Sequence, residues 1–123
     1  MPNYTFSSQN VFKSVVKLLG QCFQAIEKKS NVWRFVLCGD YSISVTRSGN
    51  GYVGIRHISN DYDERFDNAV LGLLDSFGFI RNSNSWLGTK SFKEYGYDDS
   101  MISAILKECL ALKEELTLLF NKM

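Results

Sequence analysis

His57 is the residue of this chain whose side chain could most readily do acid–base chemistry, because imidazole gains and loses a proton near neutral pH. It is the only histidine, and it lies next to Arg56 and close to Asp61 and Tyr62. A single histidine at the end of a strand is more often a hydrogen-bonded structural residue than a general base. The sequence also contains no glycine-rich phosphate loop, nucleophile elbow or metalloprotease helix motif. We therefore predict no catalytic residue and no enzymatic activity.

Three cysteines, Cys22, Cys38 and Cys109, are the other side chains that could bind a metal. They are far apart in the sequence, and each falls where a helix or strand pattern calls for an apolar residue. Free cysteine behaves as a small hydrophobic residue, and His57 is the only imidazole that could join a metal site. We interpret the three as buried, reduced thiols, and we expect no metal and no cofactor.

A group of carboxylates falls in an expected helix and consists of Asp61, Asp63, Glu64, Asp67 and Asp75. The first three lie in the first turn, where the helix dipole stabilises negative charge. We interpret the group as capping and solvated residues. The alternatives are an acidic contact surface and acid–base chemistry.

An irregular segment before the final helix carries aromatic side chains that favour a binding role. Tyrosine and tryptophan in loops are typical of interface hot spots, because they bring a large contact area at a low cost in entropy. The alternative is that these aromatic rings close the open end of the core. The residues predicted here to contact a partner are Trp86, Lys90, Phe92, Tyr95 and Tyr97.

The final helix, expected from Asp99 to Lys122, has more apolar surface than one sheet face easily covers. A heptad-like seam consists of Ile102, Ile105, Cys109, Leu112, Leu116 and Leu119. Apolar residues outside the seam are Met101, Leu106, Leu110, Leu118 and Phe120. We predict that the first half packs within the chain. The second half is then expected to contact a partner or a second copy through Leu112, Leu116 and Leu119.

The central element that must position these residues is a three-stranded antiparallel meander over residues 32–58. Apolar and polar residues alternate there, and turn residues fall at positions 39–40 and 48–51. The first strand is apolar on both faces, which predicts a central strand covered on both sides. The second strand is expected to face water with Ser42, Ser44 and Thr46.

Helices and a second hairpin are expected around the meander. An apolar stripe predicts a first helix from Val11 to Lys28, and a second helix begins at Asp61 and ends before Gly78. Phe79–Arg81 and Ser85–Phe92 are expected to pair as a hairpin, which brings the sheet to five strands. The predicted fold class is α+β, an antiparallel sheet packed by three helices in the order α-β-β-β-α-β-β-α.

Length and composition set the class of protein. At 123 residues and a formal net charge of +1, the chain is expected to fold as one domain, residues 1–123, without disulfides. It has no apolar run long enough to span a membrane, and its first residues lack the pattern of a signal peptide. No segment has the density of basic residues that nucleic-acid binding uses. We predict a cytoplasmic protein that binds neither nucleic acid nor membrane.

The order of the elements and the segment LLDSFGFIRNSNSWLG resemble those of small type III secretion chaperones and related bacterial domains. The resemblance implies a helix-on-sheet homodimer that holds an extended segment of an effector protein on hydrophobic surface. Those chaperones tend to be acidic, whereas this chain is nearly neutral. One layout of this kind serves many functions.

We expect a non-enzymatic protein-binding module of bacterial or phage type: a secretion-chaperone-like protein, an immunity protein or an inhibitor of a target protein. Its partner is another protein, and it is expected to be a homodimer. The alternative is a protein that binds or sequesters a small, nucleotide-like ligand. In that case Arg56, His57 and Arg81 bind the ligand in a cleft beside the sheet, with Lys90 and Trp86 close by.

Overall fold

The computed structural model describes residues 8–46, 52–59, 64–81, 86–95 and 99–122. In chain order, the elements are α1 (Ser8–Cys22), β1 (Ala25–Lys28), β2 (Val32–Cys38), β3 (Tyr41–Thr46), β4 (Tyr52–His57), α2 (Glu64–Ser76), β5 (Trp86–Ser91), a 3-10 turn η3 (Lys93–Tyr95) and α3 (Asp99–Lys122). The predicted α+β class is confirmed.

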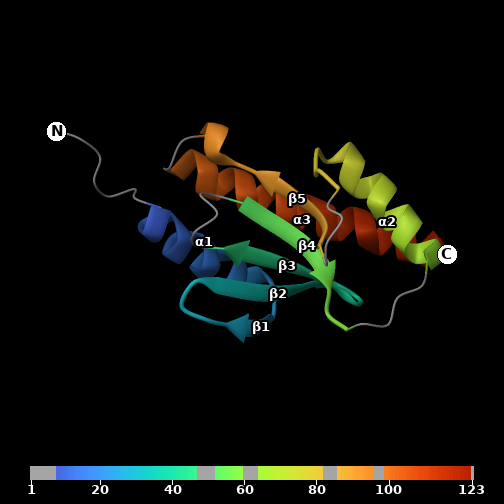
Figure 1. The fold of residues 1–123 in the computed structure, drawn as a ribbon, viewed down its shortest axis with the longest axis horizontal. Coiled ribbons are helices and arrows are strands. Elements are labelled where there is room, and N and C mark those ends of the chain that lie inside the picture. Colours follow the sequence, from blue (N-terminus) through green and yellow to red (C-terminus); the bar gives the residue numbers. More distant parts are fainter. Residues whose placement is uncertain (1–7, 47–51, 60–63, 82–85, 96–98, 123) are drawn as a thin grey trace.

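The five strands form one antiparallel sheet, in which each strand pairs with the next one along the chain. Figure 1 looks onto this sheet, with α3 behind it. The predicted meander is confirmed as β2, β3 and β4. Gly39, in the turn between β2 and β3, has the positive φ of 57° that the turn prediction requires. The turn predicted at residues 48–51 lies outside the described residues.

The first predicted helix is too long. α1 ends at Cys22, and Ala25–Lys28 form an edge strand that pairs with β2. The side chains of this strand are alternately half-buried and exposed, and Nζ of Lys28 lies 5.2 Å from the centre of the Trp33 ring. Ile26 also fits the apolar stripe of a helix, so the pairing with β2 decides the structure of this segment.

The second predicted hairpin is correct only in its later strand. β5 lies within the predicted range 85–92, but Phe79–Arg81 contribute a single bridge between Ile80 and Thr89. The side chain of Phe79 is buried in the core while Ile80 is exposed. β1 is therefore the additional strand, and the observed order is α-β-β-β-β-α-β-α.

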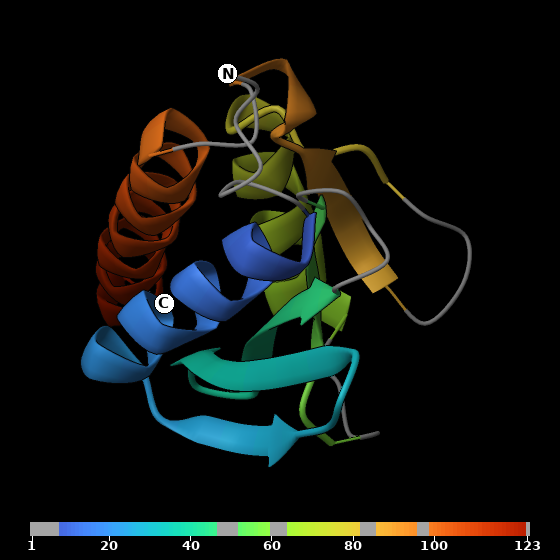
Figure 2. The same ribbon diagram turned by 90° about the vertical axis from the view of Figure 1, so that its left-hand side faces the viewer.

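All three α-helices lie on one side of the curved sheet (Figure 2). No helix in the described ranges covers the other side. α3 packs on α1 and β2, while α2 packs on α3 and β5. Fully buried side chains between the layers include Leu19, Phe35, Leu37, Ile43, Ile55, Leu74, Ile105 and Leu112.

The side of the sheet without helices is drier than predicted. Ser42 and Ser44, expected to face water, are 0% and 1% exposed. Ser42 is covered by the long side chain of Arg34, which donates hydrogen bonds from Nη2 to Ser42 Oγ at 3.1 Å and to the His57 carbonyl at 3.0 Å. Ser44 lies opposite Arg34 in the pairing of β2 with β3. Nη1 of Arg34 donates to Glu27 Oε1 at 3.5 Å. The prediction that β2 is covered on both faces holds only partly, because this side of β2 is half-buried.

Candidate functional site

Three of the residues predicted to contact a partner belong to the core of the chain. Phe92, Leu112 and Leu116 are each 0% exposed, so that prediction is wrong for these three. Buried residues of the α3 seam extend from Ile102 to Leu116, on the side that packs on α1 and β2. A seam that packs internally and a seam that forms a dimer have the same sequence pattern, which explains the error.

Lys90, another predicted contact residue, is held inside the fold. Its Nζ donates to the carbonyl of Phe77 at 2.6 Å and to Glu108 Oε1 at 2.9 Å. The ammonium also lies 5.3 Å from the centre of the Phe92 ring, within the range of a cation–π contact. Lys90 therefore joins β5 to the end of α2 and to the middle of α3.

Of the remaining predicted aromatic contacts, Tyr95 is the one that the structure places at the surface. It is 45% exposed, and its ring centre lies 6.0 Å from that of Phe92. The side chain of Trp86 and the whole of Tyr97 lie outside the part of the chain that the structure describes. The predicted aromatic contact site thus consists of one surface ring beside a buried one.

Leu119, the last residue of the predicted set, lines a groove between α2 and α3. The groove is open to solvent and has a volume of about 370 Å³. One wall comes from α2 and consists of Ala69, Gly72, Leu73 and Ser76. The other wall comes from α3 and consists of Glu115, Leu118, Leu119 and Lys122. We refer to these eight residues as the α2–α3 groove.

Small side chains on α2 keep the groove open. Gly72 has no atom within 4 Å of the place where a Cβ would lie. On the opposite wall, Leu118 is 48% exposed. Glu115 and Lys122 are seven residues apart on α3, which is about 10 Å along the helix axis. The groove therefore has an aliphatic interior with an acid toward one end and a base toward the other.

A cluster of aromatic and polar side chains fixes the two walls to each other and to the sheet. The Phe66 ring on α2 meets the Phe120 ring on α3 edge-on, with centres 5.6 Å apart. Phe120 stacks on Tyr41 of β3 at 5.9 Å. Asp67 Oδ1 on α2 accepts a hydrogen bond from the Tyr41 hydroxyl at 2.5 Å and lies 2.9 Å from His57 Nε2. His57 thereby holds α2 to the end of β4.

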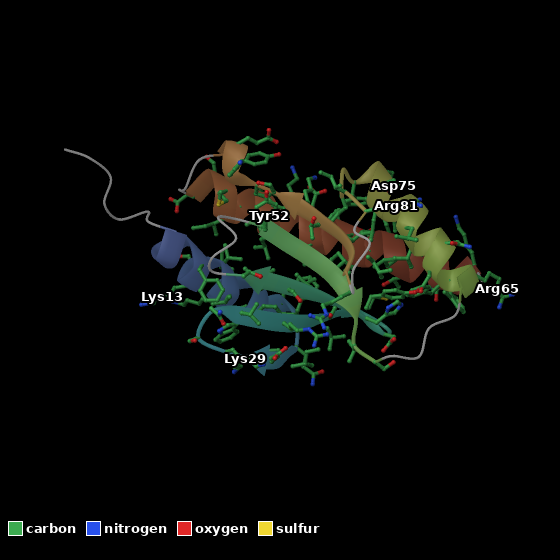
Figure 3. All side chains as sticks on the ribbon, viewed as in Figure 1. Lys13, Lys29, Tyr52, Arg65, Asp75 and Arg81 are labelled. Carbon is green, nitrogen blue, oxygen red and sulfur yellow. The ribbon has the colours of Figure 1, made fainter. Side chains whose placement is uncertain are left out.

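The residues of the alternative ligand site do not come together. His57 contacts Asp67, whereas Arg81 contacts Asp75, with 2.7 Å between Nη2 and Oδ2. Figure 3 shows Asp75 and Arg81 side by side, and the carboxylate raises the pKa of the Arg81 guanidinium. The two aspartates are eight residues apart on α2, about 12 Å along its axis. Arg56 is half-buried in β4, and none of the three predicted ligand residues lines the groove.

The cysteines differ from the prediction that all three are buried. Cys109 is buried, Cys38 is intermediate and Cys22, the last residue of α1, is exposed. Burial raises the pKa of the Cys109 thiol to about 12, with a smaller contribution from the charge of Glu108. Within the described ranges, no three His, Cys, Asp or Glu side chains form a group that could hold a metal ion.

The sequence predicted only part of the groove. The predicted surplus of apolar surface on α3 is confirmed at Leu110 and Leu118, which are exposed, whereas Met101 is buried. Glu115, Lys122 and the α2 wall belong to no recognisable motif. Their one signal is spacing, since both walls follow the i, i+3, i+4, i+7 pattern of a single helix face.

No protein-family model, curated protein or solved structure matches this chain. The resemblance to type III secretion chaperones stays a prediction. Of the helices in the described part of the chain, none is long and apolar enough to cross a membrane.

Proposed function

We propose that this chain is a non-enzymatic protein-binding module whose contact surface is the α2–α3 groove. The observation that carries the proposal is an aliphatic interior, formed by Leu73, Leu118 and Leu119, flanked by Glu115 and Lys122. An apolar centre with a polar rim is the usual anatomy of a protein–protein contact.

The exposure of Leu118 supports this proposal. Burying a leucine completely gains roughly 1.5–3 kcal/mol, and Leu118 is still 48% exposed. About half of that gain is therefore available to a partner. An apolar side chain placed in the groove covers Leu118 and Leu119 together. The free energy gained by burying each of the two leucines therefore contributes to the same contact.

The shape of the groove indicates the kind of segment that fits. Its walls are two helices, and a volume of about 370 Å³ holds a few side chains. An amphipathic helix presents apolar residues at i, i+3 and i+4, and such a helix commonly lies in a groove of this type. The proposed partner is a protein with an amphipathic helix at its surface.

A protein-binding module of this kind is a bacterial or phage protein of one of three classes: secretion chaperones, immunity proteins and protein inhibitors. Members of these classes act by covering a surface of their target protein. Binding through the groove does this without a catalytic step. We also place the protein in the cytoplasm and propose that it is a homodimer. The exposed free thiol of Cys22 supports the cytoplasm, because such thiols stay reduced there.

Site-specific photo-crosslinking in the native cells tests the proposal. A photoreactive amino acid replaces Leu118 in the groove, and the same residue at Ser103 serves as the control, since Ser103 is exposed on α3 and does not line the groove. We expect a discrete protein adduct from position 118 and none from position 103. Gly72→Leu fills the groove and is expected to remove the adduct.

Besides the absence of any adduct from position 118, two results would overturn the proposal. One is the same set of adducts from positions 118 and 103, which would mean that the groove has no selectivity. The other is an adduct from position 118 that Gly72→Leu leaves unchanged, which would place the partner outside the groove. Circular dichroism of each variant confirms that the fold is retained.

A further inference from the structure

One face of α3 carries a sequence that complements itself when it is reversed. Glu115, Leu118, Leu119 and Lys122 follow the i, i+3, i+4, i+7 spacing of a single helix face, and all four line the groove. The face reads acid, leucine, leucine, base in one direction and base, leucine, leucine, acid in the other. Two copies of this face therefore match in charge when the helices run antiparallel.

The two charges are not used within α3 at helical spacing. Opposite charges three or four residues apart stabilise a helix. The residues at these distances from Glu115 are Ala111, Leu112, Leu118 and Leu119, and those that precede Lys122 at these distances are Leu118 and Leu119. Neither charge has an opposite one at that spacing along its own helix.

We propose that the α2–α3 groove binds α3 of a second copy of this chain, as an antiparallel pair with a twofold axis between Leu118 and Leu119. The inference rests on the proposed function and names its partner. Glu115 of one copy then lies at the same level as Lys122 of the partner subunit. Both residues are about 5 Å along the helix axis from the centre of the pair. The ion pair forms twice, because a twofold interface brings the same two surfaces together in both directions.

Leu118 supplies the apolar contact of the pair. It is exposed on one wall of the groove, and the other wall offers the space left by Gly72 and Ala69. Leu118 of each copy enters the groove of the other, as a knob enters a hole between helices. This contact covers Leu118 of both copies. The antiparallel arrangement that pairs the charges therefore also buries the leucines.

The size of the face sets the expected affinity. A standard stable interface buries about 800 Å² per partner and involves about 20–30 residues on each side, whereas eight residues line this groove. The dimer is therefore expected to be in equilibrium with monomer at micromolar concentrations. In such an equilibrium, a change at the two ion pairs produces a measurable change in the dissociation constant.

Sedimentation velocity of the purified full chain, at concentrations on both sides of the micromolar range, measures that constant. Glu115→Lys and Lys122→Glu each place like charges at both ends of the pair, and each is expected to weaken the dimer by at least about tenfold. The double variant Glu115→Lys/Lys122→Glu reverses both charges and is expected to restore the dimer. An equimolar mixture of the two single variants is expected to form a heterodimer.

Glu114→Lys is the matched control, because it makes the same change in net charge at an exposed neighbouring position. Glu114 lies about 100° around the helix from Glu115 and outside the groove. It is expected to leave the dissociation constant unchanged. Circular dichroism confirms that the exposed substitutions keep the fold.

The outcomes separate this inference from the proposed function. A wild-type chain that is monomeric throughout, with position 118 cross-linked to a different protein, overturns the second copy as the occupant and leaves the protein-binding function standing. The absence of any adduct from position 118 overturns both. A dimer that Glu114→Lys and Glu115→Lys weaken equally overturns the antiparallel pairing.

Discussion

His57 Nε2 lies 2.9 Å from Asp67 Oδ1, and this contact joins the last residue of β4 to the first turn of α2. The same carboxylate oxygen accepts a hydrogen bond from the hydroxyl of Tyr41, and Tyr41 as a whole is only 5% exposed. Because α2 forms one wall of the groove, a polar contact between the sheet and α2 helps to set the width of the candidate binding site. The histidine that the sequence offers as a general base thus has a structural role here.

Asp67→Ala is expected to lower the free energy of unfolding by about 1–3 kcal/mol, because it removes an acceptor shared by a buried hydroxyl and a half-buried imidazole. Asp75→Ala is the matched control on the same helix. Its partner Arg81 has a side chain that is 59% exposed, and exposed ion pairs contribute little to stability. Urea unfolding followed by circular dichroism measures both variants. Equal losses of stability would contradict the role given to Asp67.

Lys90→Met is expected to lower the free energy of unfolding by about 1–3 kcal/mol, because it leaves Glu108 and the Phe77 carbonyl without a charged donor. Lys93→Met, at an exposed position just beyond β5, is the control and is expected to leave stability unchanged. Urea unfolding distinguishes the two. If Lys90 were a contact residue, its substitution would weaken partner binding and leave the unfolding midpoint in place.

The meander could be predicted from the sequence because its information is local. Turn residues and the two-residue alternation of side chains specify β2, β3 and β4 without reference to distant parts of the chain. The short strand Ala25–Lys28 could not be assigned in this way, since its four residues also fit a helix and only the pairing with β2 selects a strand. The burial of Ser42 likewise depends on Arg34, which comes from the neighbouring strand.

The candidate site was predicted less well, and the reason is again distance along the chain. The apolar seam of α3 shows that the helix packs against something, but the same seam serves an internal contact and a dimer. Leu112 and Leu116 proved to be internal, and Leu119 reached the groove. The groove itself exists because small residues on α2 face α3, and the relative placement of the two helices is a tertiary property that neither segment encodes alone.

Gly72→Ala is expected to raise the free energy of unfolding by about 0.5–1 kcal/mol, because alanine favours the helix and its Cβ meets no atom within 4 Å. Gly88→Ala is the contrasting variant, since its Cβ would lie 3.2 Å from Cβ of Phe79 in the buried part of β5. It is expected to lower stability. Thermal and urea unfolding measure the direction of both changes in stability. A loss of stability in Gly72→Ala would show that the groove has no room for a Cβ at position 72.

Burial of the Cys109 thiol predicts a loss of stability at alkaline pH. The pKa of this thiol is raised from 9.0 to about 12 in the folded chain. Between these values the unfolded chain releases the proton and the folded chain keeps it, so the unfolded state binds fewer protons and stability falls as the pH rises. The stability gained from this burial is fully present below about pH 9. Above that pH, one such group accounts for a loss of at most about 1.4 kcal/mol per pH unit.

Cys109→Ala tests this dependence through the slope of stability against pH. The variant is expected to be less stable than the wild type at neutral pH, because a buried side chain is shortened. Its free energy of unfolding is then expected to fall less steeply above about pH 9, since the thiol that ionises on unfolding is gone. Cys22→Ala, at an exposed position, is the control and is expected to follow the wild-type slope. Urea unfolding at a series of pH values measures all three proteins, and parallel curves for wild type and Cys109→Ala would show that Cys109 is not shielded from water in the folded chain.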